Sequence, residues 1–408
     1  MIVALVSAVW FAVAIYAWVR YRDVFREVVL RRPVLAFESD DWGPGPAEDG
    51  VRLGELAACA CSYRDSRNQP ATVTLGVVLA IADTPVGTSE DEGYHRLTLG
   101  SERCSPVRQA MLDGVAQGVF FLQLHGAEHY WPPALLAAAR RDESVAGWLS
   151  TRGIPRTESL PSHLQSRWID ASTLPSKPLE DPAISLAVED EVRLFEKVFG
   201  KAPEVVVPPT FVWNERVERA WVRHGIRVVI TPGCRREVRD PAGALEAPTK
   251  RIRNGDRGAN SGPLYLVRDV YFEPALGHAA DAAIYRVLHK ARLGLPALVE
   301  MHRFNFVDDI SKARSSLAEF QRLLELALGA LPDLRFLPPG ELADAIVRRD
   351  PDLVEMRLLG RVAVWLRRLW EERRIRWLAF ATGAVVPAAV LWFTAGLLTK
   401  KVRVGATA

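Results

Sequence analysis

Short apolar runs alternate with amphipathic stretches through the middle of the chain. Runs of the kind that form strands buried on both faces of a parallel sheet occupy residues 34–41, 71–80, 119–124, 205–207, 228–230, 264–267 and 297–301. Stretches with helical spacing of apolar residues lie between them, at residues 47–61, 107–117, 133–149, 184–199, 214–224, 279–293 and 311–328. Strand and helix thus alternate about seven times, which predicts an α/β fold with a closed or nearly closed barrel of parallel strands.

Two segments lack both patterns. Residues 151–183 are rich in Pro, Ser and Thr, and residues 233–262 are polar and contain several glycines. Long loops inside compact domains are commonly functional. We therefore interpret residues 151–183 as an irregular insertion that serves as a lid or a substrate-binding segment, and residues 233–262 as a loop.

Both ends of the chain are apolar. Residues 1–19 and 377–399 contain no charged side chain, and each approaches the roughly 20 residues that cross the hydrocarbon core of a bilayer. The first segment lacks the basic start and the cleavage site of a signal peptide. We therefore predict a transmembrane anchor at residues 1–19 and a transmembrane helix at residues 377–399, which places the protein in a membrane.

A basic stretch precedes the second apolar segment. Residues 353–376 contain seven arginines, with leucines and Trp365 at roughly helical spacing. This pattern is typical of an amphipathic juxtamembrane helix that lies on anionic membrane lipid. The alternative is a solvated helix that simply continues into residues 377–399.

The distribution of arginine predicts an orientation. Five arginines follow residues 1–19 between Arg20 and Arg32, and none precedes them. The positive-inside rule therefore places the large middle region in the cytoplasm. The net charge of +3 is too small to indicate a nucleic-acid partner, and the sequence identifies no protein partner.

Side chains that bind metals or move protons follow three of the predicted strands. Asp40 and Asp41 end the first, His125 and His129 follow the third, and His302 follows the last. The carboxyl ends of parallel strands meet on one face of a barrel. Two histidines and a carboxylate with open positions are typical of catalytic zinc, and a second carboxylate can act as a general base. Each motif alone also arises by chance or as a turn cap, but their joint occurrence favours a divalent-metal site.

The order of these motifs resembles that of the polysaccharide deacetylases of the NodB-homology type, the family-four carbohydrate esterases. The resemblance covers residues 33–345 as a set of short motifs. It implies a distorted (β/α) barrel that uses a divalent metal, usually zinc, to remove acetyl groups from a carbohydrate substrate. By this resemblance Asp40 is the general base and His302 the general acid. The metal ligands are Asp41, His125 and His129.

The chain departs from the family pattern at two motifs. Trp42 is interposed after the Asp-Asp pair, and the segment 207–214 contains proline but no arginine. The arginine that would hold the base carboxylate is therefore missing or supplied elsewhere. Asp269 is a candidate to orient His302. The candidate substrate-binding residues are Trp42, Trp213, Asn214, Asp269, Glu273, Arg303 and Asn305, although Trp213 is equally well explained as a core residue.

We therefore expect a membrane-anchored, metal-dependent hydrolase that removes N-acetyl groups from a polysaccharide or a glycolipid precursor. One alternative is a glycoside hydrolase that uses two carboxylates across a glycosidic bond, drawn from Asp40, Glu128, Glu273 and Glu300. Another is a non-catalytic protein that binds carbohydrate or assists assembly. The family resemblance implies an extracytoplasmic catalytic domain, whereas the arginine distribution implies a cytoplasmic one.

Overall fold

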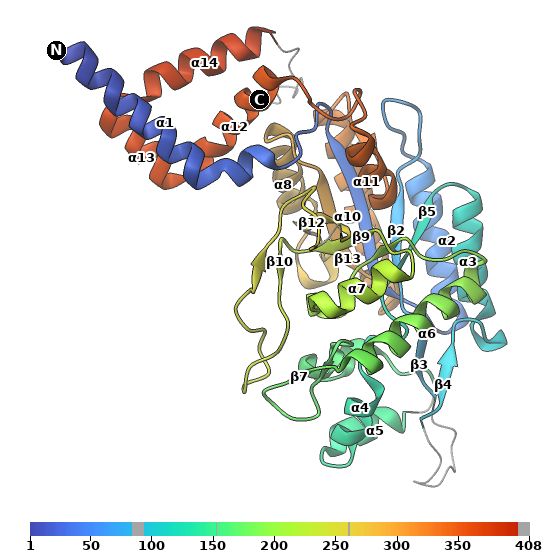
Figure 1. Cartoon of the computed structure of the whole chain (residues 1–408). Helices are drawn as coiled ribbons and strands as arrows, with labels where there is room; N and C mark the ends of the chain where they lie inside the picture. The colour runs from blue at the N-terminus through green and yellow to red at the C-terminus, as the bar shows by residue number, and fades with distance from the viewer. Residues whose placement is uncertain (84–93, 152, 260–261, 399–408) are drawn as a thin grey trace.

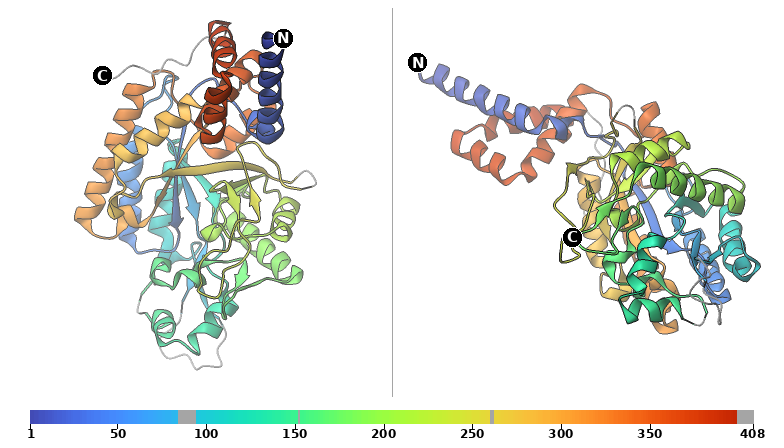
Figure 2. Two further views of the ribbon diagram at one scale, coloured as in Figure 1. Left: turned by 90° about the vertical axis from the view of Figure 1, so that its left-hand side faces the viewer. Right: turned by 60° about the horizontal axis from the view of Figure 1, so that its bottom comes forward.

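The computed structural model describes residues 1–83, 94–151, 153–259 and 262–398. They form a strand-and-helix domain with a group of helices, contributed by both ends of the chain, packed at one end of it (Figure 1). The views in Figure 2 keep these terminal helices together and beside the same end of the domain.

Seven parallel strands close into a ring. The ring order is β1-β2-β5-β8-β9-β12-β13, and β13 pairs back onto β1. The strands are β1 (Val34–Trp42), β2 (Val73–Val77), β5 (Phe120–Leu124), β8 (Val205–Val206), β9 (Val228–Thr231), β12 (Leu264–Tyr271) and β13 (Ala297–His302). A short strand, β14 (Arg335–Phe336), pairs with β1 outside the ring. The predicted barrel of about seven parallel strands is confirmed, and the two-residue β8 makes it a distorted one.

Helices cover the outside of the barrel, each through one apolar face. On α2 (Ala47–Cys61) the buried residues Leu53, Leu56, Ala57 and Ala60 follow helical spacing, as an amphipathic helix requires. Inside the domain, Phe37 of β1 meets Phe320 edge-on at 4.9 Å between ring centroids. The other covering helices are α3 (Ser105–Ala116), α6 (Asp181–Phe199), α7 (Glu215–Arg223), α8 (Ala280–Arg292), α10 (Ile310–Ala330) and α11 (Pro339–Arg348).

The remaining elements belong mostly to loops at the carboxyl ends of the strands. They include the hairpin β3 (Ala80–Ala82) and β4 (Arg96–Thr98), the helices α4 (Pro132–Ala139), α5 (Glu143–Leu149) and α9 (Phe304–Val307), and the pair β10 (Cys234–Arg235) and β11 (Lys250–Arg251). The described part of the insertion at 151–183 contains two short 3₁₀ turns and a minimal strand pair, β6 (Ile169–Asp170) and β7 (Lys177–Pro178). This fits the predicted irregular insertion.

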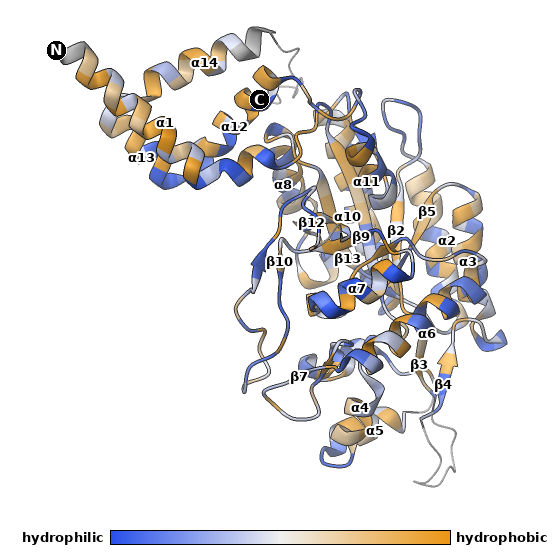
Figure 3. Cartoon of the chain, viewed as in Figure 1, coloured by the Kyte–Doolittle hydropathy of each residue, from blue (hydrophilic) through white to orange (hydrophobic). Residues whose placement is uncertain are grey.

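The N-terminal helix α1 (Ile2–Arg26) is apolar and largely exposed. Residues Ala4–Arg26 are long and apolar enough to cross a membrane. Its exposed side chains include Leu5, Phe11, Ile15, Trp18 and Val19, and the ribbon of α1 is coloured as hydrophobic over much of its length in Figure 3. Apart from Met1, the predicted segment 1–19 lies within α1, before a kink at Tyr21.

The C-terminal segment differs from its prediction. The basic stretch forms α12 (Leu358–Glu371), and a second helix, α13 (Arg373–Thr382), begins at once. A bend of 109° separates α13 from α14 (Val385–Leu398), with Gly383 in the left-handed conformation at the break. The helices therefore do not follow the predicted bounds 353–376 and 377–399, because the breaks fall at Glu372 and Gly383. Thr399 lies outside the described residues.

The terminal helices attach where the barrel strands begin. Arg368 of α12 is buried and donates hydrogen bonds to the carbonyl oxygens of Val24, Val28, Leu293 and Gly294. These acceptors precede β1 and β13 in the chain. The carboxyl ends of the strands therefore lie at the opposite end of the barrel from this attachment.

Candidate active site

Two adjacent acids end β1 and point in different directions. Asp40 lies opposite His302 in the parallel register of β1 and β13. Asp41 has a φ of 68°, a left-handed conformation that is uncommon for non-glycine residues although aspartate adopts it more readily than most. This local turn lets consecutive carboxylates serve separate roles. Gly76 of β2 makes room for the first of them, since a Cβ there would lie 2.3 Å from Asp40 Oδ1.

Asp41, His125 and His129 converge. Asp41 Oδ1 lies 3.3 Å from the Nε2 atom of each histidine. One ligand atom from each of the three residues lies within 4.8 Å of the other two. The two histidines come from the loop after β5 and the aspartate from the end of β1. The ligand atoms of the three residues that the sequence assigned to a metal therefore surround one position.

The surroundings of these side chains fit a divalent cation. His125 Nδ1 donates to the carbonyl oxygen of Val207 at 2.8 Å, and this contact directs Nε2 of the ring towards Asp41. Burial lowers the pKa of His129 to about 4, so its ring is neutral at neutral pH. Asp41 Oδ1 is buried and has no hydrogen-bond partner among the described residues. Two imidazoles and one carboxylate are a ligand set of catalytic zinc.

Asp40 is held by a buried arginine from another strand. Arg268 of β12 donates to Asp40 Oδ2 at 2.6 Å, and both side chains are almost fully buried. Burial opposes ionisation of Asp40, but the charge and hydrogen bond of Arg268 outweigh it and hold its pKa below the ordinary value. The other oxygen, Oδ1, is buried without a hydrogen-bond partner in the described residues. Asp40 therefore keeps one oxygen free to accept a proton.

Arg268 takes the place of the arginine that the segment 207–214 lacks. The segment 207–214, which lacks one, instead places the ring of Phe211 against Arg268, with 5.2 Å between the guanidinium carbon and the ring centroid. The guanidinium also faces Glu38 at 3.7 Å and Glu300 at 3.4 Å. Burial raises the pKa of Glu38 to about 7 despite Arg268. The arginine is thus supplied by β12.

His302 has its own acidic partner. Its Nδ1 donates to Glu273 Oε1 at 2.5 Å, and Asn305 Nδ2 holds the other oxygen of Glu273. Burial favours the neutral ring, but the hydrogen bond and charge of Glu273 outweigh it and raise the pKa of His302 to about 10. His302 is therefore protonated at neutral pH, with Nε2 free to donate. Glu273 and Asn305, expected to bind substrate, instead position this histidine.

Three further substrate candidates are corrected. Trp42 and Trp213 are fully buried, and their indole N–H groups donate to Ser39 and Glu218. Neither presents a face on which a sugar could stack. Asn214 caps α7, because its Oδ1 accepts from the backbone N–H groups of Arg216 and Val217. Helix capping explains this residue without any substrate.

Asp269 does not orient His302. It pairs with Lys290 on α8, and Glu273, four residues further along the chain, takes the histidine. The register of β12 shifts between Arg268 and Val270, and the contact with Lys290 places the Asp269 side chain against the covering helix α8. Arg303, another of the seven substrate candidates, lines a cavity.

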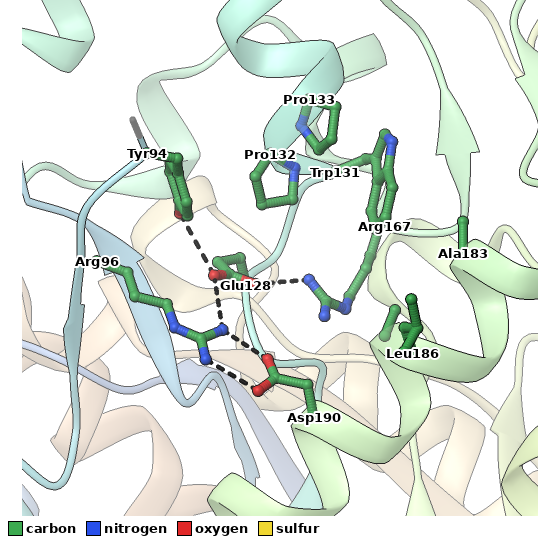
Figure 4. A pocket seen from close by; sticks show the side chains of 11 residues that line it. Tyr94, Arg96, Glu128, Trp131, Pro132, Pro133, Arg167, Ala183, Leu186 and Asp190 are labelled. Carbon is green, nitrogen blue, oxygen red and sulfur yellow. Dashed lines mark hydrogen bonds and ion pairs between the residues drawn. The ribbon is translucent and has the colours of Figure 1, made fainter. Parts of the chain in front are cut away.

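Glu128 stands between the two histidines in sequence but belongs to a separate charged cluster (Figure 4). It is buried and pairs with Arg167 at 2.6 Å, while Arg96 binds Asp190 at 2.6 Å. These groups line a cavity of about 500 Å³ together with Trp131 and Leu186. Each charge there has a close opposite charge, and through Glu128 the cluster holds the loop that carries the two histidines.

Comparisons with known proteins find likeness in structure alone. No protein-family model and no curated protein sequence matches the chain. A solved structure from Mycobacterium smegmatis, assigned as a polysaccharide deacetylase, is 11% identical with a TM-score of 0.43, over 78% of this chain and 91% of that one. The peptidoglycan deacetylase PdaC from Bacillus subtilis is 13% identical with a TM-score of 0.37, over 79% and 94%.

A pseudoenzyme of carbohydrate esterase family 4 from Bacillus anthracis is also similar, at 9% identity and a TM-score of 0.32, over 71% of this chain and 61% of that one. The similar structures thus include members of the family whose motifs the sequence resembles, and also a member without activity. At these identities and scores the likeness decides nothing about function. The chemistry of the site must do so.

Proposed function

We propose that this protein is a membrane-anchored, metal-dependent hydrolase that removes N-acetyl groups from the sugar residues of a glycan. One observation carries the proposal: a three-ligand cluster, a carboxylate with a free oxygen and a histidine paired with Glu273 lie together at the carboxyl ends of β1, β5 and β13. Amide hydrolysis needs a polarised carbonyl, a base for water and an acid for the departing amine. These are the three roles that the cluster can fill.

Asp41, His125 and His129 would hold the cation, and zinc fits this ligand set best. A bound divalent cation would polarise the acetamide carbonyl and make a nearby water more acidic. Arg268 keeps Asp40 ionised, and the free Oδ1 of Asp40 accepts a proton from the attacking water. His302 gives its Nε2 proton to the nitrogen as the carbon–nitrogen bond breaks. The products are acetate and a free amine.

The glycoside-hydrolase alternative fits the geometry less well. Such an enzyme needs two carboxylates on either side of a bond. Glu128 is bound to Arg167 and Glu273 to His302, and both glutamates are buried. Each glutamate is thus held by a basic partner and is not free to act on a glycosidic bond. Release of shortened sugars without acetate would favour this alternative all the same.

Acetate release from N-acetylated oligosaccharides tests the proposal. Asp40→Asn keeps the shape of the side chain but removes the base, so turnover should fall by at least about 100-fold while bound metal stays nearly unchanged. His125→Ala should lose both metal and turnover. Full activity in the Asp40→Asn protein would refute the assigned base.

Membrane anchoring is part of the proposal. It is supported by the length and composition of Ala4–Arg26 and by the exposed apolar side chains of α14, among them Val386, Val390 and Phe393. The arginines after residue 19 favour a cytoplasmic catalytic domain. Protease protection of the barrel in sealed inner-membrane vesicles of known orientation tests this: the barrel should be digested in inside-out vesicles and protected in right-side-out ones.

A further inference from the structure

A cavity of about 240 Å³ lies beside the catalytic residues. It is lined by residues 44–46, Asp49, residues 153–156 and Arg303. Pro44 comes three residues after Asp41, and Arg303 directly follows His302. The cavity therefore opens at the end of the barrel that carries the proposed catalytic groups.

Arg303 is buried in this cavity with incomplete hydrogen bonding. It is 5% exposed, and its Nε has no hydrogen-bond partner among the described residues. Its Nη atoms lie 3.5 Å from the carbonyl oxygen of Pro44, 3.9 Å from Asp49 and 3.4 Å from Glu158. Charge-assisted hydrogen bonds are normally about 2.7 to 2.9 Å long. The guanidinium thus lacks a close acceptor, which a bound molecule would supply.

The charges around Arg303 decide the class of that molecule. Asp49 and Glu158 face the one guanidinium, and the neighbouring Arg156 is already paired with Asp308. A phosphate or a carboxylate would meet two carboxylates, and a cation would meet the arginine. Hydroxyl groups suit both, because each accepts from an arginine and donates to a carboxylate. The prolines and Ile154 add apolar walls that suit the C–H faces of a sugar ring.

We propose that this cavity is a subsite for a neutral sugar residue next to the one that reacts. The proposal rests on the proposed function and narrows its substrate to neutral glycan chains, instead of nucleotide-linked or phosphate-linked sugars. The cavity near Glu128 differs, because its arginines already have acceptors at 2.6 Å.

Kinetics with three probes tests the subsite in the full-length protein. The probes are N-acetylglucosamine, its neutral β-1,4-linked tetramer and UDP-N-acetylglucosamine, with acetate measured. The tetramer should exceed the monomer in kcat/KM by at least about tenfold, since each charged hydrogen bond gained is worth that order. The UDP-sugar should not exceed the monomer. Preference for the UDP-sugar would overturn the proposal.

Variants separate the subsite from the chemistry. Arg303→Lys and the isosteric Asp49→Asn should raise KM for the tetramer roughly 10- to 100-fold, with a much smaller effect on kcat. Arg322→Lys, a matched change on the outer face of α10, should change neither. Equal loss of kcat on monomer and tetramer in both variants would contradict a binding role.

Measuring tetramer binding in a protein without turnover distinguishes the subsite proposal from the deacetylase proposal. The tetramer should bind the Asp40→Asn protein, and adding Arg303→Lys should weaken this affinity by about the factor seen in KM. If no probe yields acetate but this difference persists, the deacetylase assignment fails and the subsite stands. If acetate is released but the second substitution leaves tetramer affinity unchanged, the subsite fails and the deacetylase assignment stands.

Discussion

Each side chain that would move a proton has one fixed partner of opposite charge. Arg268 holds Asp40 and Glu273 holds His302, so the base stays ionised and the acid stays protonated over the same range of pH. Groups whose pKa values are pushed apart in this way mark acid–base sites. The partners come from β12 and from the loop that follows it.

The charge of Glu273 predicts a change in the pH profile. His302 is competent as an acid only while protonated, so activity should be lost as pH rises through its pKa, about 10 here. Glu273→Gln removes the charge that raises this pKa, and the alkaline limb of kcat/KM should move down by more than about one unit. Asp269→Asn, which alters a nearby carboxylate that binds Lys290, should leave the limb in place. An unmoved limb in Glu273→Gln would mean that another group is the acid.

At the scale of elements, strand ends explain which parts of the site the sequence could predict. Asp40, Asp41, His125 and His302 lie at or next to the ends of β1, β5 and β13. An apolar run followed by such residues can be recognised in the sequence, so these site residues could be predicted. The predicted strand at 264–267 is correct but too short, because β12 continues to Tyr271. Arg268 was missed for this reason: a charged residue ends an apolar pattern, and its burial depends on Asp40, which is distant in sequence.

A substitution at Gly76 of β2 tests how closely this strand packs against Asp40 of β1. An alanine Cβ at Gly76 would lie 2.3 Å from Asp40 Oδ1, so Gly76→Ala should displace the carboxylate from Arg268. Misplacement of a reacting group by about 1 Å can cost on the order of 100-fold in rate, and we expect a loss of that size in kcat with metal content retained. Gly54→Ala on α2 is the control, because its Cβ meets no atom within 4 Å. Equal activity in both variants would contradict the placement of Asp40.

At the scale of the whole molecule, the two chain ends and the barrel form one packed unit. The sequence predicted apolar ends but not their arrangement, because the bend at Gly383 and the contacts of Arg368 depend on tertiary packing. Trp365 likewise donates to the carbonyl oxygen of Tyr21 at 3.2 Å. The helices proposed to enter the membrane thus attach to the barrel at the end opposite the site.

Arg368 should hold this arrangement together. Arg368→Met removes a buried charge and leaves the carbonyl oxygens of Val24, Val28, Leu293 and Gly294 short of a donor. We expect a loss of about 2 to 4 kcal/mol in the free energy of unfolding, measured by urea unfolding in detergent. Arg322→Met, at an exposed position, should cost less than about 1 kcal/mol. Similar values for the two variants would show that the terminal helices are only loosely attached.

The central claim is that Asp41, His125 and His129 hold one divalent cation where Asp40 and His302 can act on an amide. Elemental analysis of the purified full-length protein tests it most directly. We predict about one zinc or other divalent ion per chain in the native and Asp40→Asn proteins, and almost none in His125→Ala. A native protein that holds no metal after reconstitution with zinc, or a His125→Ala protein that holds as much as the native one, would contradict the account.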